Sequence, residues 1–239
     1  MEKTKRSFKA FFTAKNITYL AVLVALVVVL QCFGGNIKIA GLSLNLALVP
    51  IALGAILFGP LVGLFLGLVC GLIVMVYGVS GSEPFTFFLF GQSPVMTVLL
   101  CLVKTAVAGA VAGLVYRPIA KKSKTAAIFV ASALVPVINT GIFSVGCFIV
   151  YDDIVEFLVS AGLDTTGMSA AYVVFVVVIT WNFFIELLTS LLLAPAVATV
   201  TRVVEKQLVR KKGGNSTEDN LHEIEAEQPV SGSDSGNVE

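Results

Sequence analysis

The fold class is decided by residues 61–79, which read LVGLFLGLVCGLIVMVYGV and carry no charged side chain. This run is as long as the roughly 17–25 apolar residues that a helix needs to cross a bilayer. The rest of the chain has the same character, since 57% of its 239 residues are hydrophobic and 13% are charged. Soluble domains are about 45–50% apolar and about 25% charged. We therefore expect an all-α integral membrane protein.

Six segments qualify as membrane spans or come close: residues 17–33, 44–59, 61–79, 94–116, 125–150 and 170–200. The second is short, and Phe58-Gly59-Pro60 supplies a turn from it into the third. These runs predict a six-transmembrane-helix bundle in residues 17–205, after a basic tail at 1–16. The remaining tail, 206–239, becomes acidic and rich in Gly and Ser, a composition typical of disorder.

Basic residues set the orientation. Fourteen of the 16 Lys and Arg residues lie in residues 3–15, 117–124 and 202–212. With six spans, an even number of crossings separates these segments, so all three lie on one side, which the positive-inside rule makes the cytoplasm. We therefore expect a multi-pass protein of the cell membrane, with its N- and C-termini in the cytoplasm. The loop 151–169, which has acidic but no basic residues, then faces outward; five spans would break this pattern.

Only two charged residues interrupt the apolar runs, Lys104 and Glu186. A charge at a helix centre in lipid costs from about 2.5 to above 10 kcal/mol, so such residues are expected to bind each other, a ligand, or both. Asn182 and Glu186 share a helix face at i and i+4, and Asn139 and Thr140 lie at comparable depth on the fifth run. The candidate substrate-binding residues are Asn45, Lys104, Asn139, Thr140, Trp181, Asn182 and Glu186.

Two interpretations of these polar residues stay open. One is a pocket for a small polar-aromatic solute, open to the outside and closed by loops at residues 36–38, 43–45 and 82–92, the last with four phenylalanines. The other is structural: a Lys104–Glu186 ion pair and an Asn139–Asn182 contact that only hold the helices together.

Several chemistries are not expected. There is no GxxxxGK[ST] phosphate-binding loop, so the chain is not expected to hydrolyse ATP or to be an enzyme. Gly78–Gly81 matches the GxSG of intramembrane serine proteases, but the only histidine, His222, lies in the cytoplasmic tail. The four cysteines are scattered singly, which argues against zinc and disulfides. No catalytic residue, metal, cofactor or nucleic-acid partner is expected.

Small residues recur at four-residue spacing in three of the spans: the first, the third and, as Ala108/Ala112 and Gly109/Gly113, the fourth. Gly63, Gly67 and Gly71 line one face of the third span, which predicts close packing inside the bundle. Ala21 and Ala25 form the one such pair on the bulky first span. This pair would let a helix of another protein approach closely.

These features together resemble the substrate-binding (S) component of energy-coupling factor (ECF) vitamin transporters. The resemblance covers residues 15–205. It rests on Ala21-xxx-Ala25 in the first span, on Leu57 to Gly63 at the turn from the second span into the third, and on Pro136 to Gly141 in the fifth span. It implies that the chain captures a vitamin from outside and docks through Ala21 and Ala25 on a transmembrane coupling (T) protein. Two ATP-binding cassette ATPases attached to that protein then drive delivery into the cell.

Riboflavin-binding members are similar in carrying a lysine on helix four and asparagines on helices five and six, as Lys104, Asn139 and Asn182 do here. They also carry a further lysine shortly after the last asparagine, where this chain has Ile185 and Glu186. The three matching residues make riboflavin the first candidate. If Lys104 and Glu186 pair, the pocket is near neutral, which suits riboflavin. If the two separate, Lys104 could hold a carboxylate, such as that of pantothenate, and Glu186 a hydroxyl or amine.

Two other functions remain open at this point. Glu186 could be the proton site of an autonomous secondary transporter, although the internal repeats common in such proteins are not evident. A membrane assembly protein without transport activity is the third possibility.

Overall fold

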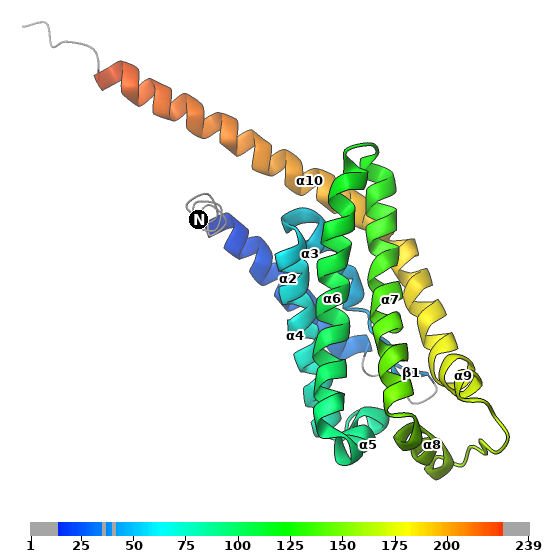
Figure 1. The fold of residues 1–239 in the computed structure, drawn as a ribbon. Helices are drawn as coiled ribbons and strands as arrows, with labels where there is room; N and C mark the ends of the chain where they lie inside the picture. The colour runs from blue at the N-terminus through cyan, green and yellow to red at the C-terminus, as the bar shows by residue number, and fades with distance from the viewer. Residues whose placement is uncertain (1–13, 35–36, 40–41, 227–239) are drawn as a thin grey trace, which may run out of the picture. The chain divides into compact units, whose positions relative to one another are not determined.

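The computed structural model describes residues 14–34, 37–39 and 42–226, and the helices of its first 198 residues form a bundle (Figure 1). The elements, in chain order, are α2 (Ala14–Gly34), β1 (Lys38–Ile39), β2 (Leu42–Ser43), α3 (Leu48–Phe58), α4 (Pro60–Val79), α5 (Pro84–Gln92), α6 (Pro94–Ala120), α7 (Lys124–Ile149), α8 (Tyr151–Ser160), α9 (Ala170–Tyr172), η1 (Val173–Ile179) and α10 (Thr180–Ala226). The expected all-α membrane bundle is confirmed. Within the described residues, the two-residue strands β1 and β2 pair antiparallel between its first two helices.

Five helices in the described part of the chain are long and apolar enough to cross a membrane. The expected second span, 44–59, is shorter than its sequence suggests, because α3 begins only at Leu48. At 1.5 Å per residue α3 is about 16 Å long, roughly half of the 30 Å hydrocarbon core of a bilayer. Residues 44–47, including Asn45, therefore lie outside the helix, at its amino end. The count of six crossings stays a prediction.

Glycine and proline mark where several helices begin. Gly59 separates α3 from α4 with φ +98°, a conformation that side chains with a Cβ rarely adopt, and Pro60 follows at the start of α4. Pro84 and Pro94 likewise open α5 and α6. Ser123 caps α7 by accepting a hydrogen bond from the Ala126 amide at 3.3 Å. The turn expected at residues 58–60 is thus present.

α4 and α6 pack with their backbones in direct contact. A Cβ on Gly63, Gly67 or Gly71 would collide with the backbone carbonyl oxygen of Gly109, Thr105 or Cys101, respectively. The Thr105 hydroxyl also donates a hydrogen bond to the Gly67 carbonyl, at 2.7 Å. The expected packing role of the three glycines is confirmed. These contacts determine how far α6 is shifted along the axis of α4.

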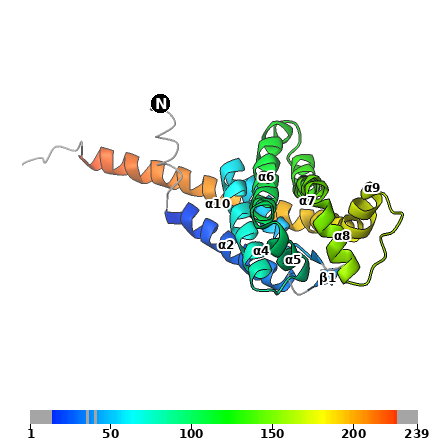
Figure 2. The ribbon, with the colours of Figure 1, turned by 60° about the horizontal axis from the view of Figure 1, so that its bottom comes forward.

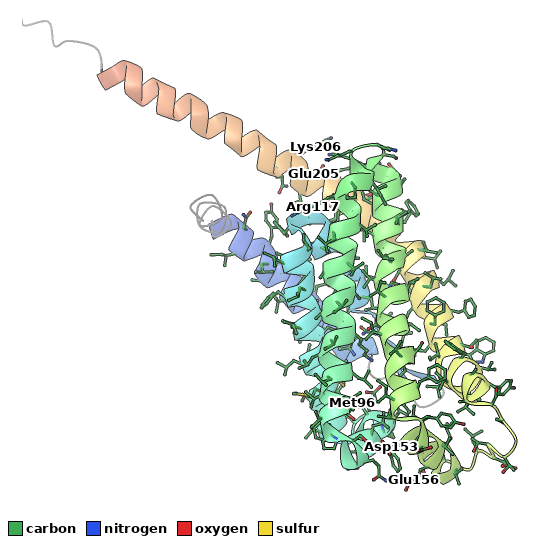
Figure 3. All side chains as sticks on the ribbon, in the orientation of Figure 1. Met96, Arg117, Asp153, Glu156, Glu205 and Lys206 are labelled. Atoms are coloured by element: carbon green, nitrogen blue, oxygen red, sulfur yellow. The ribbon has the colours of Figure 1, made fainter. Side chains whose placement is uncertain are left out.

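The two ends of the bundle differ in charge. Figure 3 shows Arg117 near one end of α6 and Met96 near its other end. Asp153 and Glu156 of α8 lie at the same end of the bundle as Met96. The acidic end also holds α5 and α8, and Figure 2 shows both together with β1 and α9 as this end turns toward the viewer. By the charge distribution, this end is the one predicted to face outward.

The last span departs from regular α-helix. Residues Val173–Ile179 form a π-helical segment, and the Thr180 hydroxyl donates to the carbonyl of Phe175, five residues earlier. Such segments are rare and often lie at functional sites. Here the segment ends at Ile179, three residues before Asn182 and seven before Glu186.

The chain divides into two units, residues 1–198 and 199–239. In the second unit the described residues continue α10 as far as Ala226, into a segment for which the composition predicts disorder. Lys, Arg and Glu are good helix formers, so a charged segment can be helical without a core to bury. The domain boundaries expected at residues 16 and 205 stay a prediction.

Candidate functional site

A polar cavity lies inside the first unit, with walls from α2, α4, α5, α6, α7 and the last span. Its open space is small, ≈ 40 Å³, which is enough for about three water molecules. The lining residues are Gln31, Asn45, Val74, Glu83, Phe85, Thr86, Lys104, Asn139, Thr140, Phe143, Ile179, Asn182, Phe183 and Glu186.

Glu186 is held by two donors from different parts of the chain. Its Oε1 accepts from the backbone N–H of Asn45 at 3.1 Å and from the Asn182 side-chain Nδ2 at 3.2 Å. Asn45 lies in the non-helical residues just before α3, where its amide can donate to the carboxylate instead of to a helical carbonyl. The positive end of the helix dipole also favours a negative charge there. Glu186 is 3% exposed, so these two donors take the place of water at Oε1.

Lys104 does not pair with Glu186. No ion pair within 4.0 Å involves Lys104 in the part of the chain that the structure describes, and its ammonium lies over the Phe143 ring, 4.6 Å from the centroid. Lys104 is ten residues into α6, about 15 Å from its start. Asn139 and Asn182, both described, also form no hydrogen bond with each other. Neither the ion pair nor an asparagine–asparagine hydrogen bond of the purely structural interpretation is therefore present among these described residues.

Three lining residues carry buried polar atoms without a hydrogen-bond partner: Asn139 Oδ1, Asn182 Oδ1 and Glu186 Oε2. Buried polar atoms in folded proteins are nearly always paired, and exceptions call for an explanation. Leaving such a group unpaired costs about 1–3 kcal/mol. Since all three belong to residues that line one cavity, a ligand bound in that cavity would explain them together.

Most of the substrate-binding residues expected from the sequence meet at this cavity. Asn45, Lys104, Asn139, Thr140, Asn182 and Glu186 all line it. Trp181 does not; it lies on the outer surface of the last span and is 66% exposed. Of the loops expected to close the pocket, Phe85 and Glu83 contribute lining side chains, whereas Asn36 lies outside the described residues.

Sequence reasoning missed several lining residues. Gln31 is a polar residue near the end of the apolar first span, a signal that could have identified it, and it is 1% exposed. The Cys70 thiol lies within 3.6 Å of the Gln31 side-chain oxygen and 3.5 Å of the Asn45 side-chain oxygen. Phe143 and Phe183 gave no signal, because aromatic residues are common on membrane helices and only the fold shows which of them face inward.

Helices α5 and α8 are joined to each other at the acidic end of the cavity. The Ser93 hydroxyl, which follows α5, donates to Asp153 Oδ2 at 2.6 Å, and Gln92 donates to Glu156 Oε2 at 3.2 Å. Phe157 of α8 meets Phe85 edge to face, with ring centroids 5.2 Å apart. Because Phe85 also lines the cavity, these contacts hold one of its walls in place.

The two docking residues expected on the first span, Ala21 and Ala25, are both exposed on α2. They lie one helical turn apart, while Leu23 and Val27 of the same helix are buried in the bundle core. The small-residue face of α2 is thus free of other helices within the described chain. It remains available for contact with another protein in the membrane.

Comparison with known families agrees with this architecture. A family model described as ECF transporter, substrate-specific component, matches residues 15–198, and the chain belongs to that family. No curated protein and no solved structure matches the chain. Membership makes the chain a membrane-embedded transporter subunit rather than an enzyme, and it implies a T protein and ATPases as partners.

Proposed function

We propose that the protein captures a small water-soluble vitamin from outside the cell in the cavity around Lys104 and Glu186. The observation that carries this proposal is the group of unpaired buried oxygens on Asn139, Asn182 and Glu186, all lining one cavity. Three buried oxygen atoms with no hydrogen-bond partner destabilise a protein unless a ligand uses them. A purely structural role would have paired them.

The cavity must open before a vitamin can enter. Pockets for molecules of this size measure about 300–1,000 Å³, whereas the open space here is ≈ 40 Å³. The cavity in this structure is therefore too small to hold a vitamin. Two parts of the chain would have to move, because they lie nearest the end of the bundle that is predicted to face outward. They are α5, which carries Phe85, and residues 44–47, which include Asn45.

Riboflavin is the first candidate, on the resemblance of Lys104, Asn139 and Asn182 to residues of riboflavin-binding members. The separation of Lys104 from Glu186 supports a second candidate that carries a carboxylate, such as pantothenate. A lysine ammonium without an ionic partner favours an anionic ligand group beside it. Phe143, under the ammonium at 4.6 Å, and Phe183 add apolar surface for the rest of the molecule.

Delivery into the cell would depend on partners. We propose that the exposed Ala21–Ala25 face of α2 docks on the transmembrane coupling protein, since small residues allow helix backbones to approach closely in lipid. Two attached ATPases would then supply the energy. Capture by this subunit requires no ATP in this scheme.

The test is calorimetric titration of the purified full-length protein, without ATP or partners, with riboflavin, pantothenate, thiamine, biotin, nicotinamide and folate. Saturable binding of one vitamin near one-to-one stoichiometry supports the proposal. Absence of binding by all six refutes it and leaves the assembly-protein alternative. Uptake by this chain alone in vesicles, driven by a proton gradient, would instead support an autonomous secondary transporter.

A further inference from the structure

The two carboxylate oxygens of Glu186 have different environments. Oε1 accepts from the Asn45 backbone amide at 3.1 Å and from Asn182 Nδ2 at 3.2 Å. Oε2 is buried and accepts from nothing in the described chain. The carboxylate is therefore anchored through one oxygen, and the other is an unused acceptor on a residue that lines the cavity.

The same contact orients Asn182. Because its Nδ2 donates to Glu186, its Oδ1 must point the other way, and that oxygen is also buried and unpaired. An amide is assigned from its hydrogen-bond network, and here the network allows one assignment. Glu186 and Asn182 are thus neighbouring side chains, and each presents an acceptor oxygen that no donor in the described chain reaches.

From this arrangement we infer that Glu186 and Asn182 form a subsite for hydrogen-bond donors, and that Glu186 determines specificity for a hydroxyl, amine or N–H group on the substrate. The inference rests on the proposed function, since it concerns the same cavity. A ligand carboxylate or carbonyl would meet these acceptor oxygens with an acceptor of its own. Any acidic group of the substrate therefore binds elsewhere, on the side of Lys104.

The substitution Glu186→Gln tests the polarity of this subsite. Gln has nearly the shape of Glu, but one of its two positions becomes an NH₂ donor. The position of Oε1 faces two donors, from Asn45 and Asn182, so the glutamine oxygen must occupy it. The NH₂ group is then forced into the position of Oε2, where it would meet a donor of the ligand.

We expect Glu186→Gln to bind about ten- to a hundredfold more weakly than the wild type, the loss that corresponds to a hydrogen bond with a charged group. The measurement is calorimetric titration of the full-length protein with the six vitamins named above. Asp152→Asn is the matched control, because this exposed carboxylate on α8 does not line the cavity, and its affinity should equal that of the wild type.

A second variant keeps the inference testable if Glu186→Gln does not fold. Asn182→Ala removes one unpaired acceptor, and we expect it to bind about two- to tenfold more weakly. Unchanged or tighter binding by Glu186→Gln, or unchanged binding by Asn182→Ala if the glutamine variant does not fold, overturns the inference while the proposed function stands. Absence of binding by the wild type to all six vitamins refutes both.

Discussion

Replacing Lys104 by methionine separates a binding role from a structural one. In the structure its ammonium has one neighbouring interaction, with the Phe143 ring at 4.6 Å, and no ion pair among the described residues. Losing a cation–π contact costs about 0.5–2 kcal/mol. Removing a charge from a partly buried site gives back a desolvation penalty. We therefore expect the free energy of unfolding of the ligand-free protein to change by about 1 kcal/mol or less.

The same substitution should strongly reduce vitamin binding. A hydrogen bond from a lysine ammonium to a ligand contributes about 1.5–3 kcal/mol, so the dissociation constant should rise about ten- to a hundredfold. The two measurements are thermal unfolding of the ligand-free variant and calorimetric titration with the vitamin. Lys121→Met, at the exposed opposite end of α6, is the matched control and should alter neither result.

The opposite pattern would refute this reasoning. If Lys104 held the bundle together by pairing with Glu186, its removal would strand a buried charge and destabilise the protein by about 3–5 kcal/mol. Unfolding at a much lower temperature with unchanged affinity would show that the lysine is structural. Unchanged stability together with unchanged affinity would show that Lys104 does not contact the ligand.

Three further predictions concern packing, access and docking. Gly67→Ala should lower stability by about 1–3 kcal/mol, because its Cβ collides with the backbone of α6, whereas Gly141→Ala, with open space around it, should not; equal unfolding temperatures would contradict the packing. Asp153→Ala should speed vitamin association in stopped-flow measurements, because α8 loses a hydrogen bond to the end of α5; unchanged rates would exclude these helices as a barrier. Ala21→Trp and Ala25→Trp should spare binding and abolish uptake into cells, and intact uptake would exclude docking on this face.

Much of the fold could be predicted from the sequence because lipid imposes a simple requirement. Each long apolar run had to become a helix, and α4, α6 and α7 appear close to the expected limits. The contact of the Asn45 amide before α3 with Glu186 could not be predicted, because the two residues lie 141 positions apart in sequence. The π-helical segment of the last span could not be predicted either, because its valine-rich sequence is equally compatible with a regular α-helix.

The site could be predicted only where a residue was anomalous in lipid. Lys104, Asn139, Asn182 and Glu186 stood out because polar groups in apolar runs are expensive. Glu83 did not, since it lies next to a polar turn and only the fold shows it buried at the cavity. Trp181 was expected in the site because its neighbours in sequence, Asn182 and Phe183, line the cavity. Its own position on the helix faces away from the cavity, which the sequence does not show.

The most direct test of vitamin capture is mass spectrometry of the small molecules that co-purify with the full-length protein from cells grown in rich medium. We predict one water-soluble vitamin at close to one molecule per protein in the wild type, and a much smaller amount in Lys104→Met purified in parallel. The absence of any vitamin from the wild type, or the same amount in the variant, would contradict the assignment of the cavity around Lys104 and Glu186 as the capture site.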